Sequence, residues 1–252
     1  MENQNIIKAI IIGACIVATG AILGNSFKKR NASLDAISVV GLGAKSFTSD
    51  EILFSGSYAS KAMDAKEAYA IINADKEKVK NFFLSKGFKG NEVTFSGISF
   101  EKSYRNVVIE SNGETTKTEQ IFDGYIARQN ISLSSKKNAE LMKKIESVAD
   151  QTSELVNSGI EFNPNTIQYT YSDLPSLKHD LIEKASQDAK ERAQKIVKTA
   201  CGDLGKLKTA SMGVFQITGE GSNEEDSYGG NNDIYSKQKS ARITVRLEYE
   251  LE

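Results

Sequence analysis

The last stretch of the chain alternates strictly between apolar and polar residues. Odd-numbered positions from Ala241 to Leu251 are apolar, and the even-numbered positions from Arg242 to Glu250 are polar or charged. Because side chains of a β-strand point alternately to opposite faces, this segment has one buried side and one solvent-facing side. Such a strand is typical of an antiparallel sheet that is covered on one face. A sheet of this kind is therefore the first requirement on the fold.

Three segments show the spacing of amphipathic helices. The first begins at Asp64, with Glu67 placed as in a capping box, and ends near Gly87. The second spans residues 136–157. The third begins after Asp173 and has a proline in its first turn. The predicted apolar stripes are Met142, Ile145, Ala149, Thr152 and Val156 in the second helix, and Leu174, Leu177, Leu181, Ala185, Ala189, Ala193, Ile196 and Ala200 in the third.

Strand patterns account for most of the remaining chain. Besides the final strand, the predicted strands cover residues 37–42, 51–60, 91–104, 119–134, 165–172 and 207–218. Asn112-Gly113 favours a type I′ turn, which makes segments 91–104 and 119–134 the arms of a long hairpin with a polar tip over 110–118. Residues 219–239 are polar and are predicted to form a loop.

An uncharged apolar run occupies residues 9–27 and approaches the roughly 20 residues that cross a bilayer. It predicts a transmembrane signal anchor, preceded by a tail over residues 1–8 and followed by a linker over 28–35 and a domain over 36–252. A cleaved signal peptide and a buried core helix are the alternatives. A lipidation site at Cys15 is disfavoured, because the apolar stretch before this residue is short.

Together these elements predict an α+β fold. It consists of mainly antiparallel sheet or sheets of about seven strands with three helices, preceded by one N-terminal transmembrane helix. The net charge is −1, from 32 basic and 33 acidic residues. A nucleic-acid-binding protein needs a basic face to displace phosphate counterions, so nucleic acid is not an expected partner. No disulfide between Cys15 and Cys201 is expected, since it would tie an apolar anchor to a folded core.

Residues with chemical potential are few. His179, the one histidine, is predicted on the surface, and Cys201 is predicted to be a small buried residue. Two S-x-x-K sequences, at 99–102 and 134–137, lack the companion motifs of a serine hydrolase.

Other candidate groups have ordinary structural interpretations. The acidic and amide residues of segment 223–233 do not have the spacing of an EF-hand. Tyr169 and Tyr171 are interpreted as one face of a strand. The sequence therefore predicts no catalytic, cofactor-binding or metal-ligating residue, and a protein that is not an enzyme.

Residues 169–213 resemble the SIMPL-domain family, whose bacterial members include periplasmic immunogenic proteins. The matching positions are Ala185, Ala189, Arg192, Ala193, Gly202, Gly205 and Ser211. Residues 37–43 also open the domain as in that family, so the resemblance covers roughly residues 35–252. It implies an exported or envelope-facing domain that tends to oligomerise, with no established enzymatic activity and no catalytic residues to carry over.

The two indications of topology disagree. Lys28, Lys29 and Arg30 after the apolar run, against Lys8 before it, favour a cytoplasmic domain under the positive-inside rule. The resemblance implies the periplasm or the cell surface, and a single-pass protein of the cell membrane with its domain on that side is the expectation.

Three functions follow in order of preference. The first is a non-enzymatic structural or self-assembling interaction module, attached to the membrane through residues 9–27 and able to form a homo-oligomer. The second is an envelope ligand- or lipid-binding module whose small-molecule ligand is unknown. The third is an enzyme that acts through His179 or Cys201.

Overall fold

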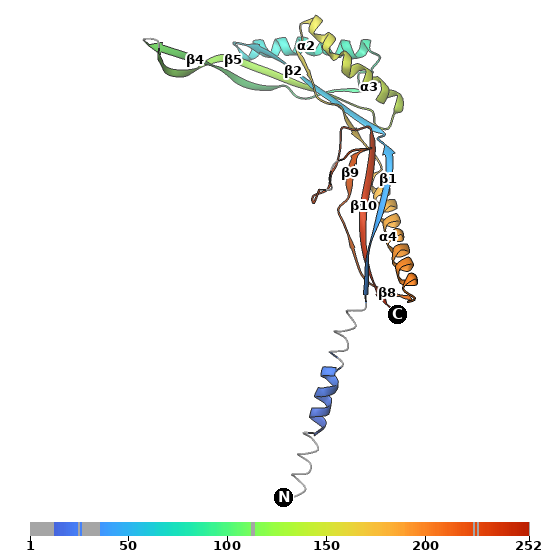
Figure 1. Ribbon diagram of the computed structural model, residues 1–252. Coiled ribbons are helices and arrows are strands. Elements are labelled where there is room, and N and C mark those ends of the chain that lie inside the picture. Colours follow the sequence, from blue (N-terminus) through green and yellow to red (C-terminus); the bar gives the residue numbers. More distant parts are fainter. Residues whose placement is uncertain are drawn as a thin grey trace.

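The computed structural model describes residues 13–24, 26, 36–111, 114–223, 225 and 227–251. Within them, strands form two antiparallel sheets, one of four strands and one of six, each covered by helices (Figure 1). The fold is α+β, but the prediction of about seven strands and three helices is wrong. Ten strands are present in the described part, together with three long α-helices, a short 3-10 helix and a helix over residues 13–24.

The four-stranded body is built from both ends of the domain. Its strands are β1 (Ala36–Thr48), β8 (Leu204–Met212), β9 (Gln216–Gly219) and β10 (Gln238–Leu251), and α4 (Leu174–Thr199) packs on it. The strand order is β1-β10-β8, with β9 also beside β10. The alternation that predicted a one-sided strand is confirmed, because the odd-numbered residues from Ala241 to Tyr249 are buried under α4.

Two glycines allow α4 to lie directly on β1. A Cβ atom at Gly41 would lie 2.1 Å from the Ala185 carbonyl oxygen, and one at Gly43 would lie 2.2 Å from that of Leu181. Ala185 and Ala189 are completely buried on the facing side of α4. Small residues on both elements therefore bring the helix backbone against the strand backbone, which explains the alanine-rich stripe.

Asp188 of α4 also closes part of the free edge of β1. Its carboxylate accepts a hydrogen bond from the Leu42 backbone N–H at 2.8 Å and pairs with Arg192 at 2.9 Å. These two contacts, the Leu42 N–H first, lower the pKa of Asp188 below its ordinary value of 3.8. Because Asp188 satisfies the outward-facing N–H group of Leu42, the edge of β1 is less able to pair with a strand of another chain.

Replacing Asp188 with asparagine is expected to lower the free energy of unfolding by about 1 kcal/mol, because a charge-assisted hydrogen bond becomes a neutral one. A depressed carboxyl pKa contributes stability above the unfolded-state pKa, and this contribution disappears as the pH falls through the lower folded-state pKa. The wild type should therefore lose this contribution below about pH 4, and D188N should not. Urea unfolding at pH 7 and at pH 3 measures both effects, and a difference that is equal at the two pH values would contradict this explanation.

The six-stranded body is inserted between β1 and α4. Its strands are β2 (Glu51–Ala62), β3 (Val93–Phe95), β4 (Ser99–Ser111), β5 (Glu114–Ser134), β6 (Phe162–Pro164) and β7 (Gln168–Thr170). Its helices are α2 (Ala65–Ser85), α3 (Ala139–Gln151) and η1 (Thr152–Ser158). The sheet order is β3-β5-β2-β6, with β4 also beside β5 and β7 beside β2. Its core is separate from that under α4, since the two clusters of buried residues share no member.

The helix starts show which local signals were reliable. The Asp64 carboxylate caps α2 by accepting from the Lys66 and Glu67 backbone N–H groups, as predicted. The second helix does not start at Lys136, because Lys136 and Lys137 both have positive φ angles. Asn138 caps α3 instead.

Two predicted apolar stripes are wrong near their ends. The tighter winding of η1 buries Leu155 and leaves Val156 66% exposed. At the end of α4 the buried stripe passes to Val197, and Ile196 is exposed. The buried residues of α4 keep a four-residue spacing from Leu177 to Val197, whereas the prediction took a three-residue step from Ala193 to Ile196 and so left the buried face.

Strand predictions failed where the chain bends. The predicted strand over 207–218 is divided into β8 and β9, and β7 is only the middle of the predicted strand over 165–172. β4 and β5 pair up to Ser111 and Glu114, while Asn112-Gly113 of the predicted turn lies outside the described residues.

The prediction of a transmembrane helix over residues 9–27 is overturned for the described part. No described helix is both long enough and apolar enough to cross a membrane. The helix over residues 13–24 lies apart from both sheets (Figure 1). Residues 9–12, 25 and 27, the tail over 1–8 and the linker over 28–35 lie outside the described residues.

Candidate interaction surface

The outer part of the β4–β5 hairpin extends beyond the rest of its sheet (Figure 1). β2 pairs with β5 only as far as Ala62 opposite Tyr125, whereas β4 continues to pair with β5 toward the tip. This segment, residues 99–111 with 114–125, is called the β4–β5 ribbon below. A two-stranded ribbon is at best marginally stable in water by itself. Contact with a partner would stabilise it, so its exposed side chains are candidates for an interaction surface.

One face of the ribbon carries all of its aromatic side chains and further apolar surface. The strand register places five aromatic or apolar residues on it, here called the apolar stripe: Phe100, Tyr104, Val108, Phe122 and Tyr125. The exposed fractions are 46% for Phe100, 53% for Tyr104 and 51% for Val108. Single exposed apolar residues are ordinary, but a set along one face marks a surface that can bury itself against a partner.

Ring contacts organise the apolar stripe. The ring centroids of Tyr104 and Phe122 lie 5.9 Å apart, and those of Phe122 and Tyr125 lie 5.3 Å apart, both edge to face. Tyr69 of α2 lies 6.4 Å from Phe100, so the stripe is on the side of the ribbon that faces α2. It therefore continues the apolar face of the sheet outward, past the region that is covered by helices.

The two faces of the ribbon differ in aromatic content. The opposite face carries the charged residues Glu101 and Arg105 but also the apolar residues Val107 and Ile121, and it has no aromatic side chain among the described residues. The striped face is not purely apolar. It also carries Lys102 opposite Tyr125, Thr118 opposite Val108, and the cross-strand pair of Asn106 and Gln120. Aromatic side chains are enriched at protein–protein interfaces, which fits the composition of the striped face.

A β-bulge marks the point where the ribbon leaves the sheet. Gly124 has a φ of +105°, and a Cβ atom there would lie 2.4 Å from the Ala62 carbonyl oxygen. Only glycine fits this position, since it needs both a positive φ and close backbone contact. Beside it, an ion pair joins Lys61 to Asp123, and the hydrogen bond from Lys61 lowers the pKa of Asp123. The bulge and the ion pair fix the direction in which the ribbon projects.

A buried hydrogen-bond chain anchors the base of the ribbon. The Tyr58 hydroxyl donates to Gln129 Oε1 at 2.6 Å, and Gln129 Nε2 donates to the Ser96 carbonyl oxygen at 2.7 Å. Burial, followed by the nearby charges of Asp75 and Glu77, raises the pKa of Tyr58, which keeps the phenol neutral. These hydrogen bonds link β2, β5 and the segment between β3 and β4. They therefore hold β5, at the base of the ribbon, from both neighbouring segments.

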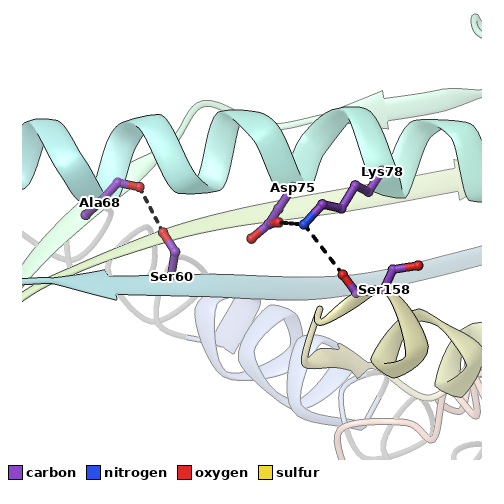
Figure 2. A network of polar contacts seen from close by, with 5 residues as sticks. All are labelled: Ser60, Ala68, Asp75, Lys78 and Ser158. Atoms are coloured by element: carbon purple, nitrogen blue, oxygen red, sulfur yellow. Dashed lines mark hydrogen bonds and ion pairs between the residues drawn. The ribbon is translucent and has the colours of Figure 1, made fainter.

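A second polar network holds α2 onto this base (Figure 2). Ser60 Oγ of β2 donates to the Ala68 carbonyl oxygen at 2.9 Å. Asp75, which is largely buried, pairs with Lys78 at 2.8 Å, and Lys78 Nζ also reaches the Ser158 carbonyl oxygen at 3.5 Å. Figure 2 shows these contacts between α2, β2 and the end of η1. They position the helix whose Tyr69 borders the apolar stripe.

The residues considered as chemical candidates are not brought together. His179 is exposed on α4, and Cys15 and Cys201 are both free and exposed. The prediction that Cys201 is buried is wrong, because the chain turns out of α4 at this residue with a φ of +58°. Among the described residues, no group of histidine, cysteine and acidic side chains is placed to hold a metal ion.

The remaining candidates have structural partners. Ser99 Oγ, in the first S-x-x-K sequence, bonds to the Arg128 carbonyl oxygen. Tyr169 donates to Glu146 at 3.0 Å, and burial, together with this hydrogen bond, raises its pKa to about 12. Tyr171 packs on Phe47 with 4.9 Å between ring centroids. In the loop after β9, Asp233 accepts from the Tyr235 and Ser236 backbone N–H groups.

Comparison with known proteins identified one family. The sequence model of the SIMPL family, described as a protein of unknown function (DUF541), matches residues 37–249. The match includes both bodies and the β4–β5 ribbon. No curated protein matches the chain in sequence. The sequence predicted the hairpin but not the apolar stripe. Phe100, Tyr104 and Val108 nevertheless lie an even number of residues apart, so a strand places all three on one face.

Proposed function

The chain belongs to the SIMPL family, and from this premise we propose that it is a non-enzymatic interaction module of the bacterial cell envelope that assembles with copies of itself. The observation that carries the proposal is the exposed apolar stripe on the β4–β5 ribbon. The family resemblance, which implies a tendency to oligomerise, supports a second copy of this chain as the partner.

The ribbon also suits self-association through its edges. Beyond Tyr125, β5 has β4 as its only partner among the described strands, and β4 pairs only with β5. Strand edges of this kind can pair with another strand, and two identical antiparallel ribbons can do so around a two-fold axis. Face-to-face contact of two apolar stripes is the alternative arrangement, and it would remove Tyr104 and Phe122 from water.

The binding of a lipid or another apolar small molecule has less support. Two hollows of the described surface, of about 450 Å³ and 340 Å³, are lined mainly by polar residues such as Asn231 and Asp233 in one and Ser132 and Ser134 in the other. A third, of about 410 Å³, is an open surface hollow at the end of α4 beside Ile196 and Ala200. Pockets for apolar ligands are usually lined by hydrophobic and aromatic side chains.

Replacing both Tyr104 and Phe122 with serine is expected to convert an oligomer of the full chain into a monomer, because the two central rings of the stripe are lost. Light scattering coupled to size-exclusion chromatography gives the mass directly. Val156→Ser is the control, since Val156 is also an exposed apolar residue but lies on η1, away from the ribbon. An oligomer that survives the double substitution, or a wild type that stays monomeric at high concentration, would contradict the proposal.

The envelope location is proposed from the family resemblance and is tested separately. Alkaline phosphatase fused after Glu252 should be active, and a fluorescent protein fused at the same place should be dark, if the domain lies outside the cytoplasm. The opposite pair of results would support the orientation that Lys28, Lys29 and Arg30 favour.

A further inference from the structure

We propose that residues 231–237 form a strap that fixes the angle between the four-stranded and six-stranded bodies, with the buried ammonium group of Lys239 as its attachment point. Release of this attachment would let the two bodies turn about the short links between them. The inference concerns how the β4–β5 ribbon is aimed relative to the four-stranded body, and it does not depend on what the ribbon binds.

The chain passes between the two bodies at only two places in the described part. The first is Ser49-Asp50, between β1 and β2, and the second is the segment from Tyr171 to Asp173, between β7 and α4. The Asp50 carboxylate joins these links by accepting from the Ser172 backbone N–H at 2.8 Å and from Ser172 Oγ at 2.5 Å. Figure 1 shows the bodies meeting at this corner with different strand directions. Two short neighbouring links form the geometry of a hinge.

The strap spans the corner from one body to the other. On the four-stranded body it pairs with β9, through hydrogen bonds of Ile217 with Asn231 and Asp233. On the six-stranded body the Ile234 carbonyl oxygen accepts from the Tyr169 backbone N–H at 2.7 Å. Lys237 adds an ion pair with Glu146 of α3 at 2.8 Å. The strap therefore resists rotation about the links.

Lys239 joins the strap to both bodies at once. It belongs to β10, is only 3% exposed, and donates from Nζ to the carbonyl oxygens of Asp233 and Tyr169. Burial lowers the pKa of Lys239, and the Asp233 carboxylate partly offsets this effect. A buried ammonium bonded to two carbonyl groups is costly to leave unsatisfied, so it holds those groups in place. A cavity of about 60 Å³ beside it leaves some room for movement.

The test measures the distance between the two bodies. Cysteines are introduced at Asn73 of α2 and Lys190 of α4 and carry spin labels, while Cys15 and Cys201 are replaced by serine. Pulsed electron paramagnetic resonance then gives the distribution of distances between the two labels. In the full chain Lys239→Met, which keeps the length of the side chain and removes its donors, should broaden the distance distribution about twofold, as expected for a released hinge. Lys198→Met, at an exposed lysine of α4, should leave the distribution unchanged.

Two results would overturn the proposal. One is an unchanged distribution in a K239M variant that keeps a native circular dichroism spectrum and a cooperative thermal transition. If K239M does not fold, the exposed pair provides the test, because Lys237→Met combined with Glu146→Gln breaks the strap's ion pair without opening the core. An unchanged distribution in that folded variant is the second contradicting result.

Discussion

Replacing Gly41 with alanine is expected to lower the free energy of unfolding of the four-stranded body by about 3 kcal/mol or more. The new methyl carbon would lie 2.1 Å from the Ala185 carbonyl oxygen and 2.4 Å from the Ala189 backbone nitrogen. Neither neighbour is a side chain that can rotate away, so α4 must move off β1. That movement also breaks the hydrogen bond between Leu42 and Asp188 and loosens the packing of Ala185 and Ala189.

Urea unfolding followed by circular dichroism measures the effect of G41A. Gly97→Ala is the matched control, because a Cβ atom at Gly97 meets nothing within 4 Å and the expected change is small. Equal stability of G41A and the wild type would show that α4 is not in backbone contact with β1.

Replacing Phe83 with alanine is expected to destabilise the six-stranded body by about 3–5 kcal/mol, the usual cost of removing a large buried aromatic side chain. Phe83 is completely buried on α2, and its ring makes edge-to-face contacts with Phe82 at 5.2 Å and Phe88 at 5.9 Å. The substitution leaves a cavity under α2, which also carries the Asp75–Lys78 pair shown in Figure 2.

The same urea titration measures F83A. Leu84→Ala, one residue further along α2 and 40% exposed, is the control, with an expected cost below about 1 kcal/mol. Because the two cores share no residue, G41A and F83A should affect different parts of the unfolding curve if the bodies unfold separately. A single transition that both variants shift together would show that the corner at Lys239 couples the bodies strongly.

Local signals in the sequence predicted most elements of secondary structure. Asp64 and Asp173 cap the helices that they were expected to cap, and strict alternation placed the odd-numbered residues of β10 in the core. These predictions succeeded because capping and alternation depend on residues that are close in sequence.

Predictions failed where distant contacts decide the outcome. Cys201 looked like a buried residue, yet it lies at an exposed turn. Lys239 appeared to end a polar loop, yet it is buried at the corner between the bodies. A side chain's chemical type does not reveal whether another segment covers it.

The sequence by itself determined an antiparallel α+β protein, its long hairpin and the side of its last strand that faces the core. The tertiary structure alone decided that the strands divide into two sheets, that the apolar stripe is left uncovered and that one lysine joins the bodies. Periodicity records which side of an element is apolar, because it reflects the geometry of the element's own backbone. Whether that side is buried depends on segments more than a hundred residues away, as Gly41 and Ala185 show, and no local pattern contains that information.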